Sequence, residues 1–151
     1  MFYQFARWVF GVALRLLFKI EAVGFDKIPE EGAVVICSNH ISWWDPCLLA
    51  YKVERPVHFM AKKDLFKIPV LSFLFKKLNA FPVNRGKADV GAIKHALYVL
   101  KDGHALGVFP EGTRQKSPTE LGQGHAGAAL LAMKGTAPIV PIAVKGEYRF
   151  R

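Results

Sequence analysis

The chain has 151 residues, of which 52% are hydrophobic and 22% are charged. This length favours one compact domain, and this composition excludes a disordered chain, a collagen-like chain and a low-complexity tract. Lys and Arg number 21 against 12 Asp and Glu, which leaves a net charge of +9. Such an excess indicates a polyanionic partner, which could be nucleic acid, anionic lipid head groups or a phosphorylated substrate.

The first segment of the chain is rich in aromatic and aliphatic residues. Residues 2–20 contain a single Gly and no Pro, which predicts a helix, and Arg7, Arg15 and Lys19 fall within one arc of it. Basic residues on one face and Trp, Phe and Leu elsewhere are typical of a helix that lies in a membrane interface. We therefore expect residues 1–22 to form an interfacial amphipathic helix; a core-packing helix with solvated arginines is the alternative. We expect neither a bilayer-spanning helix nor a secretory signal.

The rest of the chain alternates apolar runs with turn signals, which predicts an α/β fold. We expect a single layered domain over residues 23–151, with a mostly parallel central sheet flanked by helices. Asp45 and Pro46 suit the N-cap and first turn of a helix, and Ser117 and Glu120 have capping-box spacing. The predicted strands are 33–37, 57–61, 80–83, 104–109 and 139–144, and the predicted helices are 45–53, 69–78, 90–100 and 124–133.

The first predicted strand is followed by a histidine and, five residues later, by an aspartate. This spacing lets the carboxylate of Asp45 reach back to one imidazole nitrogen of His40 and leaves the other nitrogen free as a base. The alternative is that Asp45 only caps its helix and that His40 only bonds a backbone carbonyl.

Two other strands end in residues suited to binding phosphate. Glu111, Gly112, Thr113 and Arg114 follow the fourth strand, and Arg85 follows the third. Glycine lets the backbone approach a ligand closely, threonine offers a hydroxyl, and arginine offers a planar fork. Because ligands of open α/β sheets bind beyond the carboxyl ends of the strands, these loops predict a site that deprotonates a group attached to a phosphate.

These residues resemble the motifs of the glycerolipid acyltransferase family. His40 to Asp45 resembles the family's HxxxxD signature, and Phe109 to Arg114 matches its Phe-Pro-Glu-Gly-Thr-Arg block without a mismatch. Phe81 to Arg85 and Ile139 to Ala143 are similar to its arginine and proline blocks, and all four occur in the family's order. The resemblance is closest to the branch that converts lysophosphatidic acid to phosphatidic acid.

The chain departs from the family pattern at three places. Asn79 and Asn84 stand where the arginine block often has Gly and Asp. Asn79 can adopt a left-handed backbone, so we expect the turn to survive. The chain ends at Arg151, just past the proline block, whereas family members usually continue for several further elements, so we expect a fragment or a short member.

The resemblance implies an acyl transfer from an acyl thioester, either acyl-CoA or acyl carrier protein, to the free hydroxyl of 1-acylglycerol 3-phosphate. His40, oriented by Asp45, would be the base, and Arg85 and Arg114 would hold the acceptor phosphate. Glu111, Gly112 and Thr113 would order the loop or contact the glycerol. A thioester is already activated, so no covalent nucleophile, cofactor or metal is expected.

The two cysteines bear on mechanism and on compartment. Cys37 and Cys47 form no CxxC pair, and we interpret them as reduced thiols in a cytosolic setting. A Cys–His nucleophile is the minor alternative. The expected location is peripheral, on the cytoplasmic face of the cell membrane.

Two other classes of protein share the positive charge. A nucleic-acid-binding module is disfavoured, because no basic stripe is interleaved with stacking aromatics and no recognition motif is present. A non-catalytic peripheral membrane protein that binds anionic lipid head groups stays open as the alternative. The pair of His40 and Asp45 distinguishes an enzyme from these two classes, since neither a nucleic-acid-binding module nor a lipid-binding protein needs a base.

Overall fold

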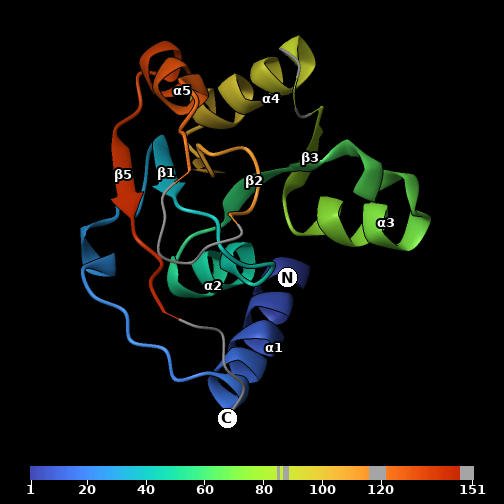
Figure 1. Ribbon diagram of the computed structural model, residues 1–151, viewed down its shortest axis with the longest axis vertical. Helices are drawn as coiled ribbons and strands as arrows, with labels where there is room; N and C mark the ends of the chain where they lie inside the picture. The colour runs from blue at the N-terminus through green and yellow to red at the C-terminus, as the bar shows by residue number, and fades with distance from the viewer. Residues whose placement is uncertain (85, 87–88, 116–121, 147–151) are drawn as a thin grey trace.

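The computed structural model describes residues 1–84, 86, 89–115 and 122–146 (Figure 1). Arg85 and the capping-box pair Ser117 and Glu120 lie outside the described residues.

Within this part of the chain, five strands form one parallel sheet in the order β3-β2-β4-β1-β5. The predicted α/β class and parallel sheet are therefore confirmed. The strands are β1 (Val34–Ser38), β2 (Val57–Lys62), β3 (Ala80–Val83), β4 (Ala105–Val108) and β5 (Ile139–Ile142).

The helices follow the strands in alternation, as the sequence pattern predicts. The main helices are α1 (Phe2–Leu17), α2 (Asp45–Lys52), α3 (Pro69–Lys77), α4 (Val90–Lys101) and α5 (Gly127–Gly135), with short 3-10 turns η1 (Phe25–Lys27) and η2 (Lys63–Lys67). Helix α5 begins at Gly127 rather than Gly124. Asn79 has φ +59°, so the turn before β3 survives the replacement of Gly by Asn, as expected.

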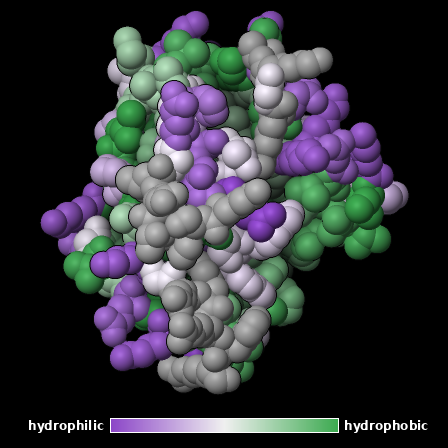
Figure 2. Space-filling model, in the orientation of Figure 1, coloured by the Kyte–Doolittle hydropathy of each residue, from purple (hydrophilic) through white to green (hydrophobic). Residues whose placement is uncertain are grey.

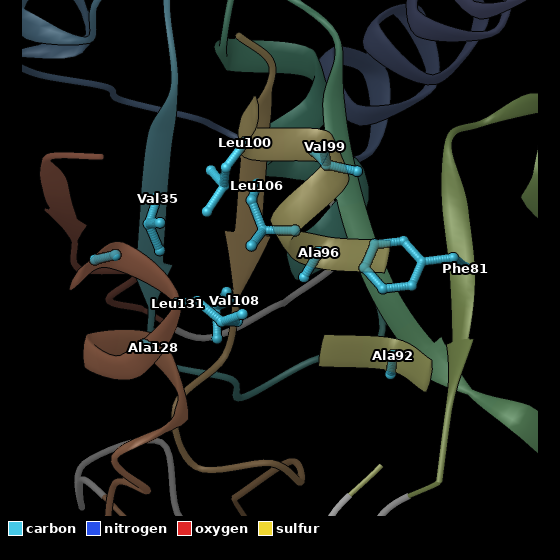
Figure 3. Packing of buried hydrophobic residues seen from close by; sticks show 11 residues of the cluster. Val35, Phe81, Ala92, Ala96, Val99, Leu100, Leu106, Val108, Ala128 and Leu131 are labelled. Atoms are coloured by element: carbon cyan, nitrogen blue, oxygen red, sulfur yellow. The ribbon is translucent and has the colours of Figure 1, made fainter. Parts of the chain in front are cut away.

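The sheet separates two hydrophobic cores. Val35, Leu106 and Val108 face α4 and α5, whose Ala96 and Leu131 point back towards them (Figure 3). The adjacent residues of β1 point to the opposite face and pack with Leu49 of α2. Successive side chains of β1 thus point into opposite cores, which explains why this strand is continuously apolar.

Both edge strands of the sheet contain a proline. Pro82 lies in β3 and Pro141 lies in β5, whereas the three interior strands have none. Proline lacks the amide hydrogen that a strand needs to pair on both sides, so it is confined to edges and bulges.

Helix α1 packs directly on α2. Leu14 is fully buried, and Gly11 lets the ring of Tyr51 approach the helix backbone closely. The helix ends at Leu17, before the end of the predicted segment 1–22, because Phe18 is extended and packs its ring edge-on against Trp44 with centroids 5.9 Å apart.

Arg7 of α1 faces the protein. Its guanidinium donates hydrogen bonds to the carbonyl oxygens of Tyr51 and Glu54, each at 3.2 Å, at the C-terminal end of α2. A helix C-terminus attracts cations, because its last carbonyls lack partners and carry partial negative charge. Arg7 therefore joins two helices and is not part of an exposed basic face.

The outward face of α1 is apolar instead. Phe5, Trp8 and Leu16 are 63%, 66% and 70% exposed, and they follow one another at helical spacing. A helix on the surface of a water-soluble domain normally presents polar residues to solvent, whereas α1 is apolar on its outward face as well as at Ala6 and Leu14, which are buried.

A close contact in β4 gives a stability prediction. A Cβ atom at Gly107 would collide with the ring of Phe59, which is 8% exposed. Gly107→Ala should therefore lower the free energy of unfolding by about 1–3 kcal/mol, the usual cost of overpacking a core. Urea unfolding measures it. The matched control is Gly127→Ala, where a Cβ meets no atom within 4 Å and no loss is expected; equal unfolding midpoints for the two variants would refute the close packing.

Candidate active site

Two neighbouring strands deliver the predicted site residues to one edge of the sheet. β1 ends at Ser38, just before His40, and β4 ends at Val108, just before Phe109. The strands pair in parallel, so their following loops leave the sheet side by side. The two motifs are far apart in the sequence, but they lie next to each other because β1 and β4 are neighbours in the sheet.

His40 and Asp45 form the expected pair. His40 Nδ1 lies 2.9 Å from Asp45 Oδ2, and the two side chains are 8% and 0% exposed. The same oxygen accepts hydrogen bonds from the backbone N–H groups of Ile41 at 2.7 Å and Ser42 at 2.8 Å. A carboxylate is an acceptor, so Nδ1 of the neutral imidazole is the donor and Nε2 holds the lone pair.

The simple helix-cap interpretation of Asp45 is wrong. Trp44 occupies the N-cap position, and Asp45 is the first residue of α2. The carboxylate reaches back over the loop that precedes the helix, where its partners are His40, Ile41 and Ser42. This oxygen therefore closes the HxxxxD loop.

The imidazole of His40 is also held by stacking. Its ring lies on the ring of Phe109, with centroids 4.2 Å apart and planes 22° apart, and Phe109 stacks in turn on Phe59. The backbone carbonyl of His40 accepts a hydrogen bond from the N–H of Gln115 at 2.8 Å. The two motif loops are thus joined both through side chains and through the backbone.

Asn39 connects this loop to the segment that follows β5. Its side-chain amide donates to the carbonyl oxygen of Val144 at 2.8 Å, and its side-chain oxygen accepts from the N–H of Val144 at 2.7 Å. Val144 also lines a cavity of about 500 Å³ between α2, β5 and the chain after α1. Asn39, the residue before His40, is therefore hydrogen-bonded to a residue that lines this cavity.

The Phe-Pro-Glu-Gly-Thr-Arg loop has a buried half and an exposed half. Glu111 is 6% exposed, and among the described residues its Oε2 has no hydrogen-bond partner. Gly112 has φ +67°, a conformation that side chains disfavour and glycine tolerates. Thr113 and Arg114 are exposed.

Arg114 rests on an aromatic side chain of the other motif. Its guanidinium carbon lies 4.0 Å from the ring centroid of Trp43, which is within the range of a cation–π contact. Trp43 is itself 66% exposed. The contact fixes the guanidinium beside the HxxxxD loop and leaves its N–H donors open to a ligand.

The sequence analysis did not assign a role to Asn39, Trp43 or Phe109. Each acts through a partner distant in sequence, and neither spacing nor residue type signals such a contact. Of the predicted residues, the structure brings together His40, Asp45 and the loop of residues 111–114. Arg85 lies outside the described residues, and its strand β3 is separated from β4 by β2.

The cysteines are not arranged as nucleophiles. Burial raises the pKa of the Cys37 thiol and that of the Cys47 thiol, which keeps both protonated near neutral pH. Over the ranges the structure describes, no three His, Cys, Asp or Glu side chains cluster as metal ligands.

Comparisons with known proteins identify the family of the chain. The model of the Acyltransferase family matches residues 19–145, so the chain belongs to this family of enzymes. It is 33% identical over 145 residues to a 1-acyl-sn-glycerol-3-phosphate acyltransferase of Bacillus subtilis, and 31% identical over 153 residues to one of Streptococcus pneumoniae. The crystal structure of the 1-acyl-sn-glycerophosphate acyltransferase PlsC from Thermotoga maritima matches 99% of the chain with a TM-score of 0.70 and 26% identity.

The chain is shorter than these relatives. The matches cover 95% and 97% of it, but only 71% of the Bacillus protein and 55% of the Streptococcus protein. It spans 61% of the Thermotoga chain. The four motif blocks, from His40 to Ala143, all lie within the matched family region.

The Asn39 clamp gives a second stability prediction. Asn39→Ala removes both hydrogen bonds to Val144 and should lower the free energy of unfolding by about 1–3 kcal/mol. Asn39→Asp keeps an acceptor for the Val144 N–H but sets a second oxygen against the Val144 carbonyl, so it should also destabilise. Gln4→Ala, which removes an exposed amide side chain from α1, is the control. If urea unfolding shows that Asn39→Ala matches this control, the clamp does not contribute to stability.

Proposed function

We propose that this protein transfers a fatty acyl group from an acyl thioester to the free hydroxyl of 1-acylglycerol 3-phosphate, giving phosphatidic acid. The observation that supports this most is the buried His40–Asp45 pair, joined to the Phe-Pro-Glu-Gly-Thr-Arg loop by ring stacking and a backbone hydrogen bond. Two relatives that match nearly the whole chain are named 1-acyl-sn-glycerol-3-phosphate acyltransferase, after this reaction.

The base acts on the acceptor hydroxyl. Nε2 of His40 takes the hydroxyl proton as the oxygen attacks the thioester carbonyl, and the Asp45 carboxylate stabilises the imidazolium through Nδ1. A C–O bond forms and the C–S bond breaks. The proton then passes from His40 to the leaving thiolate, which departs as a thiol and restores the neutral base.

The acceptor phosphate is held at the exposed end of the same loop. Arg114 presents its guanidinium beside the HxxxxD loop, and we propose Arg85 as a second cation at the phosphate. Oε2 of Glu111, which has no hydrogen-bond partner in the part of the chain that the structure describes, would accept a hydrogen bond from the glycerol, and this would relieve the cost of burying that oxygen. Gly112 and Thr113 keep the backbone close to the ligand.

The acceptor is a lipid, so we propose that the protein works on a membrane surface. The apolar outward face of α1, with Trp8 and Leu16, suits burial at the boundary between head groups and acyl chains. No described helix has both the length and the hydrophobicity to cross a bilayer. Two reduced cysteines fit the cytoplasmic face, where acyl-CoA or acyl carrier protein would supply the thioester.

A non-catalytic protein that binds anionic head groups is the second candidate, favoured by the same exposed arginine and apolar helix. Such a protein needs no base. The three hydrogen bonds that converge on Asp45 Oδ2 beside a buried imidazole therefore favour the enzyme.

Asp45→Asn tests the base directly. An asparagine oxygen can occupy the position of Oδ2 and accept the same three donors, so the loop should stay closed and the melting temperature should fall little. The charge that stabilises the imidazolium is lost, and acyl transfer should fall at least about a hundredfold. Thioester consumption with lysophosphatidic acid present measures it.

His40→Ala should be equally inactive, and the double variant should be little worse than either single one, because residues that act as a unit are not additive. Near-normal turnover of Asp45→Asn would mean that Asp45 only closes the loop.

Arg114→Lys tests recognition of the phosphate. Lysine keeps the charge and can still lie on Trp43, but it lacks the bidentate fork, so KM for lysophosphatidic acid should rise about tenfold. An acceptor without phosphate, such as a monoacylglycerol, should be affected less. Equal losses with both acceptors would show that Arg114 supports the loop and does not bind the phosphate.

A further inference from the structure

Helix α3 and the turn before it form a lobe that stands apart from both cores. This α3 lobe, residues 63–78, lies at the side of the sheet beside edge strand β3 (Figure 1). No residue of η2 or α3 is buried. Yet nine of its sixteen residues are large and apolar: Leu65, Phe66, Ile68, Val70, Leu71, Phe73, Leu74, Phe75 and Leu78.

The outer surface of the lobe is apolar. Ile68, Val70 and Phe73 are 51%, 75% and 61% exposed. In Figure 2 the same region, at the right of the view, shows hydrophobic surface bordered by hydrophilic residues. Exposed apolar patches with a polar rim mark sites of protein or membrane contact.

The polar rim of the lobe is basic. It contains Lys63, Lys67, Lys76 and Lys77 and a single acid, Asp64, which forms ion pairs with Lys67 at 2.7 Å and with Lys62 outside the lobe at 2.9 Å. Lys77 lies over the ring of Phe73 at 5.7 Å. Aromatic and aliphatic side chains surrounded by lysines match an anionic lipid surface. A second copy of the same lobe would instead bring lysines against lysines.

The position of the α3 lobe also fits contact with an anionic lipid surface. In Figure 1, α1 lies at the bottom of the view and α3 at the right, and both are below α4 and α5. Both expose apolar faces. In Figure 1 the arrow of β5 points towards the end of the sheet where α2 and α1 lie, and β1 and β4 run parallel to it, so the loops that hold His40 and Arg114 leave the sheet at that end.

We propose that the α3 lobe is a second membrane contact, which inserts Ile68, Val70 and Phe73 into the interface of an anionic bilayer while its lysines bind head groups. This inference rests on the proposed work at a membrane surface. Two separate contacts fix the tilt of the domain on the bilayer, which a single helix cannot do. They therefore orient the catalytic loops towards the lipid acceptor.

The test is sedimentation of the full chain with vesicles of phosphatidylcholine containing about one third phosphatidylglycerol. The lobe variant Ile68→Ser/Val70→Ser/Phe73→Ser should reduce partitioning about tenfold or more. The matched control changes three equally exposed residues on α4 and α5, Val90→Ser/Tyr98→Ser/Met133→Ser, and should bind like the wild type. Lys67→Gln/Lys76→Gln/Lys77→Gln should weaken binding to these anionic vesicles and leave binding to vesicles of phosphatidylcholine alone unchanged. Circular dichroism checks that each variant is folded.

The outcomes separate this inference from the proposed function. If Trp8→Ser/Leu16→Ser loses binding but the lobe variant does not, the lobe contact is overturned while the α1 contact stands. A wild-type dimer in solution that the lobe variant converts to a monomer would also overturn it, because a second copy would then be the occupant. If the lobe variant loses vesicle binding but no form of the protein consumes thioester, the lobe contact stands and the proposed reaction fails.

Discussion

One carboxylate oxygen organises the candidate active site. Oδ2 of Asp45 receives the imidazole of His40 and two backbone N–H groups, all within 2.9 Å. Without it, the loop after β1 would have to leave two partly buried amide groups without this acceptor, which is costly away from bulk water. The same contact that closes the loop also sets the tautomer of the base. Loop stability and base chemistry are therefore coupled at a single atom, although Asp45→Asn can separate the charge from the hydrogen bonds.

Stacked aromatic rings connect the hydrophobic core to His40. Phe59 of β2 stacks on Phe109, and Phe109 stacks on His40, so the ring of the base continues a column that begins in the hydrophobic core. Gly107 leaves the space that Phe59 occupies. Because well-packed interiors transmit small displacements, a change of volume at Gly107 should reach the imidazole without touching any substrate.

The sequence was sufficient for the strands, because β-branched runs are local signals. The short spacing of His40 and Asp45 allowed their pairing but left a simple helix cap open, and the geometry of the loop decides between the two. The sequence was insufficient where a partner lies far along the chain. Arg7 was expected on an exposed basic face, but it caps α2 through the carbonyls of Tyr51 and Glu54. The periodicity of α1 showed two faces but could not say which one meets the protein. For the α3 lobe the sequence predicts a helix over residues 69–78 but not its exposure, since hydrophobic composition does not distinguish a buried helix from an exposed one.

The prolines at the two edges of the sheet have a consequence for the behaviour of the protein at high concentration. An edge strand with a full row of N–H and C=O groups is a template for another strand, and this is a common route to aggregation. Pro82 and Pro141 interrupt that row on both sides, one at each edge. A protein with this much exposed apolar surface on its helices is thus guarded against sheet-to-sheet association. Self-association, where it occurs, would be driven by helix surfaces, and detergents that cover those surfaces should reverse it.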